Sequence, residues 1–230
     1  MKPPDEAHVE FGGVRMAFGR RVVFRDLSCR FPRGRMSVIL GGSGSGKSTL
    51  LRLIGGLVRP QAGRIVVDGD EITTRSEREM YAVRKKLGMM FQDGALLDSL
   101  TVFENVVFGL ANVDDLLPNQ LSGGMVKRAS LARAIIMKPV ILLCDEPFSG
   151  LDPVSVKLIE TLLVHVNRQL QGTMIIVSHH IASTMRIADH VVLLLPDGPV
   201  EGSPAELRRT TDPRIAGFLD EDGAAPEARA

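Results

Sequence analysis

The sequence of 230 residues predicts one α/β domain with a mainly parallel central sheet. Short apolar segments alternate with segments of helical periodicity, as expected when helices cover the faces of a parallel sheet. A glycine-rich loop follows the first of these apolar segments, and an Asp-Glu pair ends another. The segments expected to form strands of this sheet are 36–40, 87–91, 140–144, 173–177 and 191–195.

The N-terminal part has a different pattern. Residues 9–11 and 22–31 mix β-branched and aromatic residues with polar ones, which predicts antiparallel strands at an edge. Residues 64–67 precede Asp68-Gly69, so we expect a further strand that ends in a tight turn. An N-terminal antiparallel β subdomain therefore accompanies the predicted parallel sheet.

Helical periodicity follows most of the predicted strands. The pattern at 48–55 stops at Gly55-Gly56, and residues 122–137 form a clear amphipathic pattern. Residues 102–117 have only a weak helical pattern, and the tail 221–230 reads as flexible. The remaining predicted helices are 77–86, 154–170 and 181–187.

Composition excludes several classes of protein. The formal net charge of +1 argues against a nucleic-acid-binding protein. The first 20 residues contain three acidic residues and no apolar run, so we expect no signal peptide. The apolar runs are far shorter than the about 20 residues that cross a bilayer. Cys29 and Cys144 are expected to be buried, reduced thiols.

The glycine-rich loop has the pattern G-x-x-x-x-G-K-S, between a predicted strand and a predicted helix. Glycines let backbone N–H groups approach phosphates, and the helix N-terminus favours anions. Lys47 can reach the β- and γ-phosphates, and the Ser48 hydroxyl can bind Mg²⁺. The residues expected to hold ATP here are Gly41, Gly42, Ser43, Gly44, Ser45, Gly46, Lys47, Ser48 and Thr49.

The acidic pair Asp145-Glu146 ends the apolar run 140–144. A parallel strand delivers such residues to the carboxyl edge of the sheet, beside the phosphate loop. Asp145 is expected to hold Mg²⁺, directly or through water. Glu146 points elsewhere and is expected to orient or deprotonate an attacking water.

The sequence resembles the ATP-binding cassette (ABC) ATPases, a branch of the P-loop NTPases, because Leu121 to Gly124 reads LSGG. This segment provides a second anion site, made of Ser122, the amides of Gly123 and Gly124, and a helix N-terminus. In the family, this signature segment caps the ATP of the partner subunit. The resemblance therefore implies a homodimer with two nucleotides enclosed between its subunits.

Other positions match family elements. Gln92 resembles the glutamine that senses Mg²⁺ and the membrane partner, which adds it to Ser48 and Asp145 as a metal contact. Asp152, in SGLD, resembles the residue that bridges the dimer, and His179 resembles the switch histidine that contacts the γ-phosphate. Phe18 occupies the place of the aromatic that stacks on adenine, with Phe24 as a competing choice. The implied catalytic residues are Glu146, His179, Gln92 and Lys47.

The chain also departs from the family. His180 stands where the family usually has Asp, and Gly42 replaces a common proline. The resemblance covers residues 8–220, with a helical subdomain at about 93–137 that has fewer residues than usual between Gln92 and Leu121. Either the subdomain is trimmed or a segment near 111–113 is missing; we favour the missing segment.

Finer resemblance points to the ATPases of MCE-type lipid transporters, through FQDGAL, SGGMVKRA and CDEPFSGLDP. It implies phospholipid transport between the inner and outer membranes. The implied partners are a membrane permease, an MCE-domain periplasmic subunit and a small STAS-domain protein, with the ATPase on the cytoplasmic face of the inner membrane. Two alternatives remain: an importer of a small polar solute, and a regulatory module that binds ATP without turnover.

Overall fold

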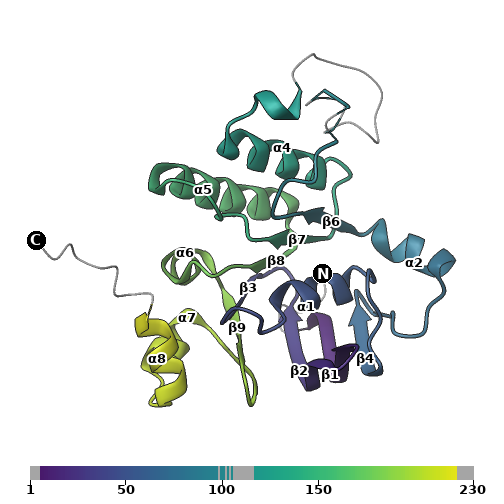
Figure 1. Ribbon diagram of the computed structural model, residues 1–230, viewed down its shortest axis with the longest axis vertical. Helices are drawn as coiled ribbons and strands as arrows, with labels where there is room; N and C mark the ends of the chain where they lie inside the picture. Colours follow the sequence, from purple (N-terminus) through teal and green to yellow (C-terminus); the bar gives the residue numbers. More distant parts are fainter. Residues whose placement is uncertain (1–5, 98, 102, 104, 106–116, 222–230) are drawn as a thin grey trace, which may run out of the picture.

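A computed structural model describes residues 6–97, 99–101, 103, 105 and 117–221. Its N-terminal part is an antiparallel sheet, as the sequence predicts, with four strands in the order β2-β1-β4-β5 (Figure 1). Strand β1 is much longer than expected and pairs with β2 across several register shifts, and β5 was not predicted. They are β1 (Ala7–Phe18), β2 (Arg21–Pro32), β4 (Ala62–Val67) and β5 (Asp70–Glu71).

The second sheet has six strands in the order β10-β9-β3-β8-β7-β6. All neighbouring strands pair in parallel except β9 and β10, which pair antiparallel. This confirms the mainly parallel sheet, and β10 is an addition that the sequence did not predict. The strands are β3 (Met36–Gly41), β6 (Leu87–Met90), β7 (Ile141–Asp145), β8 (Thr173–Val177), β9 (His190–Leu195) and β10 (Gly198–Gly202).

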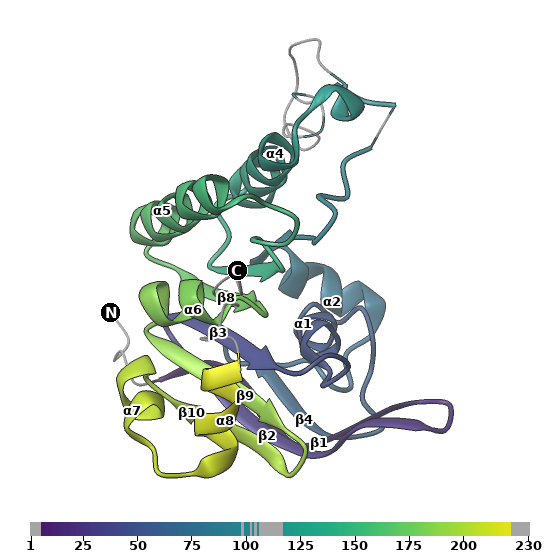
Figure 2. The same cartoon turned by 60° about the vertical axis from the view of Figure 1, so that its left-hand side comes forward.

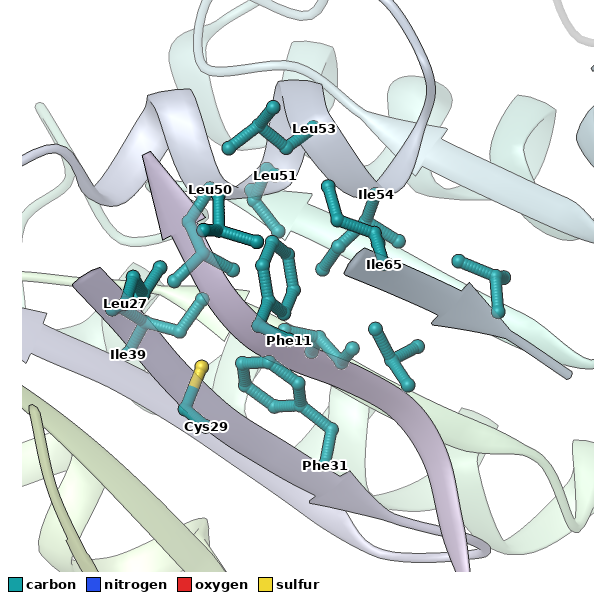
Figure 3. Packing of buried hydrophobic residues seen from close by; sticks show 14 of the residues in the cluster. Phe11, Leu27, Cys29, Phe31, Ile39, Leu50, Leu51, Leu53, Ile54 and Ile65 are labelled. Atoms are coloured by element: carbon teal, nitrogen blue, oxygen red, sulfur yellow. The ribbon is translucent and has the colours of Figure 1, made fainter. Parts of the chain in front are cut away.

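Strands β3, β7 and β8 of this sheet are buried on both faces, which explains why they are mostly apolar. On one face, Ile39 packs with residues of the antiparallel sheet and of α1 (Lys47–Ile54). Figure 3 shows Leu50, Leu51 and Ile54 of α1 above this cluster, in which Phe11 and Phe31 meet edge to face. On the other face, the alternate residues, such as Val38, pack against α5 (Pro153–Leu170).

The other helices match the predictions closely at α2 (Glu77–Arg84), α4 (Gly123–Ile135) and α6 (Ile181–Ile187). Two helices were not predicted, α7 (Pro204–Arg209) and α8 (Pro213–Glu221), and a short 3₁₀ helix spans Pro118–Gln120. Most of the weak pattern at 102–117 lies outside the described residues. The predicted tail does too, except Glu221, which ends α8.

The helical part lies at one end of the molecule. Figures 1 and 2 show α4 and α5 together beyond the β6–β7 end of the sheet, with α7 and α8 far from them. In the described stretches of the chain, no helix has both the length and the apolar character that spanning a bilayer requires.

Candidate functional site

The glycine-rich loop joins the end of β3 to the start of α1, as the sequence predicts. Gly46, the N-cap of α1, has φ 101, a left-handed conformation that glycine adopts without strain. A Cβ at this position would lie 2.6 Å from Cζ of Phe24. Backbone geometry and packing therefore both require glycine at the start of this helix.

Lys47 folds back over the loop. Its Nζ donates hydrogen bonds to the carbonyl oxygens of Gly41, at 2.7 Å, and Gly42, at 3.1 Å. Burial lowers the pKa of Lys47, whereas nearby Glu146 and Asp145 oppose that shift. The ammonium is thus held within the loop, where it can exchange carbonyl oxygens for those of an anion.

A cavity of about 370 Å³ opens over this loop. Its lining includes Lys47, Ser48 and Thr49 of the loop and α1, and it also includes the more distant Phe18, Gln92 and Glu146. Four separate segments of the sequence therefore meet at one cavity.

Asp145 ends β7 and lies next to α1. The Ser48 hydroxyl donates a hydrogen bond of 3.1 Å to Oδ1 of Asp145. Burial raises the pKa of Asp145, while the Ser48 hydrogen bond and the charges of Arg52, Lys127 and Lys47 act against it. A hydroxyl and a carboxylate together are the hard oxygen donors that Mg²⁺ prefers, so the pair fits the predicted metal site.

Glu146 is held by the neighbouring strand β8 and the segment after it. It has φ 48, and its backbone N–H donates to the carbonyl oxygen of Val177 at 2.9 Å. Its Oε2 lies 2.8 Å from Nδ1 of His179 and accepts a 3.4 Å bond from the His179 backbone N–H. Both residues line a second cavity of about 370 Å³, which also touches Lys47 and Gly41.

The two candidate aromatic residues have different environments. Phe24 is 7% exposed and packs beneath Gly46, so its ring faces the core. Phe18 is 46% exposed at the end of β1 and lines the loop cavity. The geometry favours Phe18 as the residue that could stack on a flat ring.

The signature segment lies elsewhere. Ser122 is the N-cap of α4, where its hydroxyl accepts a hydrogen bond from the Met125 N–H at 3.4 Å. Among the described residues that line the two loop cavities, none belongs to 122–124. Asp152 similarly caps α5, accepting from the N–H groups of Val154 and Ser155. A hydrogen bond from the Ser155 hydroxyl is the main cause that lowers the pKa of Asp152.

The sequence reasoning missed one residue near the site, Lys127. Buried Lys127 reaches the carbonyl oxygen of Glu146 from α4. Its signal was the spacing of three between Lys127, Ser130 and Arg133, which places these polar residues on a face apart from the apolar side of the helix. His180, which was assigned no catalytic role, is the N-cap of α6, with Nδ1 accepting from the Ser183 N–H at 3.3 Å. An imidazole nitrogen thus does the work of a carboxylate at this cap.

Comparison with known proteins agrees with this geometry. The ABC transporter family model matches residues 24–149. The intermembrane phospholipid transport system ATP-binding protein MlaF of Escherichia coli K12 is 38% identical, over 95% of this chain and 91% of that protein. The probable ribonucleotide transport ATP-binding protein mkl of Mycobacterium tuberculosis H37Rv is 36% identical, over 94% of this chain and 67% of that protein. The MlaF alignment spans 245 positions, more than the 230 residues here, so that relative has residues with no counterpart in this chain.

Solved structures are similar as well. The cbiO1 subunit of the cbiONQ ABC transporter from Clostridium perfringens has a TM-score of 0.78 at 27% identity, covering 94% of this chain and all of that one. The dimeric ATP-binding cassette MJ0796, in a post-hydrolysis state with ADP and Pi, has a TM-score of 0.75 at 26% identity. That similarity covers 85% of this chain and 98% of MJ0796.

Proposed function

The chain belongs to the ABC transporter family of ATPases, and from this premise we propose that it hydrolyses ATP at the loop cavity to drive phospholipid transport. The observation that supports the site is the meeting of Lys47, Ser48 and Glu146 at one cavity, with Asp145 hydrogen-bonded to Ser48. One side supplies cationic and amide donors for phosphates. The other supplies the carboxylates that hydrolysis requires.

Each residue then has a chemical task. The loop amides and Lys47 bind the phosphate oxygens of ATP and spread the charge that develops on them. Ser48, Asp145 and the more distant Gln92 would hold Mg²⁺, which supplies further positive charge at the phosphates. Glu146 orients a water and accepts its proton, while the Nδ1 contact of His179 keeps that carboxylate in place. Phe18 stacks on the adenine.

The active form in this proposal is a homodimer. Ser122, Gly123 and Gly124 are accessible and remote from the chain's own cavity lining, so they can cap the ATP bound by a second copy. Asp152 would bridge the two subunits. Support comes from the MJ0796 cassette, a similar structure that is dimeric.

The cargo is proposed from the relatives. MlaF, which carries phospholipid transport in its name, covers nearly the whole chain at 38% identity. A second candidate is a small polar solute, because mkl is named for ribonucleotide transport and is 36% identical. The agreement of FQDGAL, SGGMVKRA and CDEPFSGLDP with lipid-transporter ATPases favours phospholipid.

The proposed assembly follows from this cargo. The ATPase would bind a permease on the cytoplasmic face of the inner membrane, with the Gln92 segment at the contact. An MCE-domain periplasmic subunit and a small STAS-domain protein would complete the complex. Within the proposed helical subdomain at about 93–137, the structure describes residues 93–97, 99–101, 103, 105 and 117–137, which include α4.

The test is purification of the complex from membranes, followed by mass spectrometry of its proteins and lipids. Vanadate-sensitive phosphate release is expected from the purified complex, and a non-hydrolysing regulatory module would release none. Co-purified phospholipid, with radiolabelled phospholipid moved between vesicles, would support the lipid cargo. Uptake of a labelled ribonucleotide with no lipid movement would replace that cargo with a polar solute.

A further inference from the structure

Lys127 lies in α4, five residues after Ser122, and is only 5% exposed. Buried lysines are rare, because removing an ammonium from water is costly unless all its donors are satisfied. Here all three donors find acceptors: the carbonyl oxygen of Gln92, the carbonyl oxygen of Glu146 at 3.0 Å and the Ser149 hydroxyl at 3.1 Å. None of these acceptors is a carboxylate, so the contact is not an ordinary ion pair.

The three acceptors belong to three separate segments around the nucleotide site. Gln92 follows β6, Glu146 follows β7, and Ser149 lies in the turn that leads to α5. The Ser149 hydroxyl also donates to the Glu146 carbonyl oxygen at 2.9 Å. One ammonium on α4 therefore connects the backbones of Gln92 and Glu146 and also bonds to the Ser149 side chain.

Two other residues of α4 hold the segment after Gln92. The Ser130 hydroxyl donates to the Gly94 carbonyl oxygen at 3.1 Å. Arg133 donates to the carbonyl oxygens of Ala95, at 2.7 Å, and Gly94, at 3.0 Å. Residues 127, 130 and 133 share one helix face at a spacing of three, so α4 and this segment form one unit. Of these three, Lys127 is the residue that also bonds to Glu146.

We propose that Lys127 is a positioning residue, which fixes the backbone of Glu146 against the signature helix and so couples hydrolysis in one site to the placement of Ser122. The inference rests on the proposed function, since it assigns Lys127 a task in that reaction. It acts through Glu146 and does not touch the nucleotide cavity, whose lining does not include it among the described residues. Its removal should therefore lower kcat and spare ATP binding.

The test compares Lys127→Met with Arg133→Met. Both changes remove one cation from the same face of α4, and both remove a hydrogen bond to a carbonyl oxygen of residues 92–95. Only Lys127→Met also removes a hydrogen bond to the Glu146 carbonyl oxygen. We expect Lys127→Met to lower kcat by about 10- to 100-fold, as small misplacements of catalytic groups do. ATP affinity in titration should match the unmodified protein, and Arg133→Met should lose far less rate.

Two further variants distinguish a positioning role of Lys127 from a loss of protein stability. Lys127→Arg keeps the charge and several N–H donors, so it should recover part of the lost kcat. Combining Lys127→Met with Glu146→Gln should weaken ATP-driven dimerisation relative to Glu146→Gln alone, because the signature segment is no longer held. If Lys127→Met does not fold, Ser149→Ala serves, with a smaller expected loss of kcat at unchanged ATP affinity.

Wild-type kcat in folded Lys127→Met, or in Ser149→Ala where Lys127→Met does not fold, would overturn the inference. So would an equal loss in Arg133→Met, since that result would show only general docking of α4. Failure of the proposed function looks different: the unmodified complex itself would release no phosphate.

Discussion

The phosphate-loop half and the signature half of the proposed site differ in what surrounds them. In the loop half, two contacts join side chains from distant segments: Ser48 bonds to Asp145, and Glu146 meets His179. In the signature half, Ser122 bonds only to its own helix among the hydrogen bonds of the described residues, and it is exposed. The half to which we assign the chemistry is therefore assembled within one chain, whereas the half proposed to cap ATP has no such contacts among the described residues.

Lys127 connects these two halves. It belongs to the signature helix by sequence and to the loop half by contact. In our proposal this connection is rigid, so a displacement of one half would also displace the other.

Glu146→Gln should slow ATP hydrolysis, while ATP still binds to the phosphate loop and to the signature segment of the second copy. We expect kcat to fall by roughly 10²–10⁴, the usual contribution of a general base. Steady-state phosphate release measures the rate, and size-exclusion chromatography with ATP should show a stable dimer. Glu10→Gln, an exposed carboxylate on β1, is the matched control. Unchanged hydrolysis in Glu146→Gln would remove that residue from its assigned role.

Lys47→Ala should weaken ATP binding by a single copy. Each hydrogen bond to a charged phosphate contributes about 1.5–3 kcal/mol, so the affinity should fall on the order of 10- to 100-fold. Calorimetric titration checks this, with exposed Lys157→Ala as the control. Wild-type affinity in Lys47→Ala would contradict the role given to the lysine.

Ser122→Ala should affect the dimer and leave the single copy's ATP affinity intact. Loss of one hydrogen bond to a partner's phosphate should weaken ATP-driven dimerisation roughly tenfold. The change also removes a helix N-cap, at a cost of about 1 kcal/mol of stability. Ser203→Ala removes the N-cap of α7 at a comparable cost and is the control. Equal dimerisation in both variants would mean that Ser122 caps its helix and does nothing more.

Phe18→Ala and Phe24→Ala should separate binding from stability. Stacking by Phe18 contributes on the order of 1 kcal/mol, so its loss should weaken ATP binding only several-fold. Loss of buried Phe24 should instead reduce the free energy of unfolding by about 3–5 kcal/mol. Chemical denaturation and nucleotide titration of both variants test this, and stronger loss of ATP affinity in a folded Phe24→Ala would reverse the assignment.

Local sequence patterns predicted much of this arrangement. An apolar strand, a glycine-rich turn and a helix must follow one another to build the loop around Lys47, so that unit is visible in the sequence. The Asp145-Glu146 pair is visible for the same reason, because a buried parallel strand can only end at one edge of the sheet. These predictions depend on neighbours in the chain.

What the sequence did not predict depends on contacts between distant residues. The acceptors of Lys127 come from segments up to 35 residues away, and a lysine on a helix is normally solvated. Strand β10 is half-buried and carries little apolar character, so its pairing with β9 had no clear pattern. Helix α7 could have been predicted from the sequence, since Ser203 and Glu206 form a capping box with a proline after the serine.

The burial of both cysteines has a consequence for site-specific labelling of the protein. Burial raises the pKa of the Cys144 thiol to about 12, and it raises that of Cys29 as well. Because the thiolate is the reactive form, maleimide reagents should leave both untouched in the folded protein. A single new thiol, such as Val154→Cys at a position 80% exposed, would then carry a fluorophore or spin label alone, without deletion of the native cysteines.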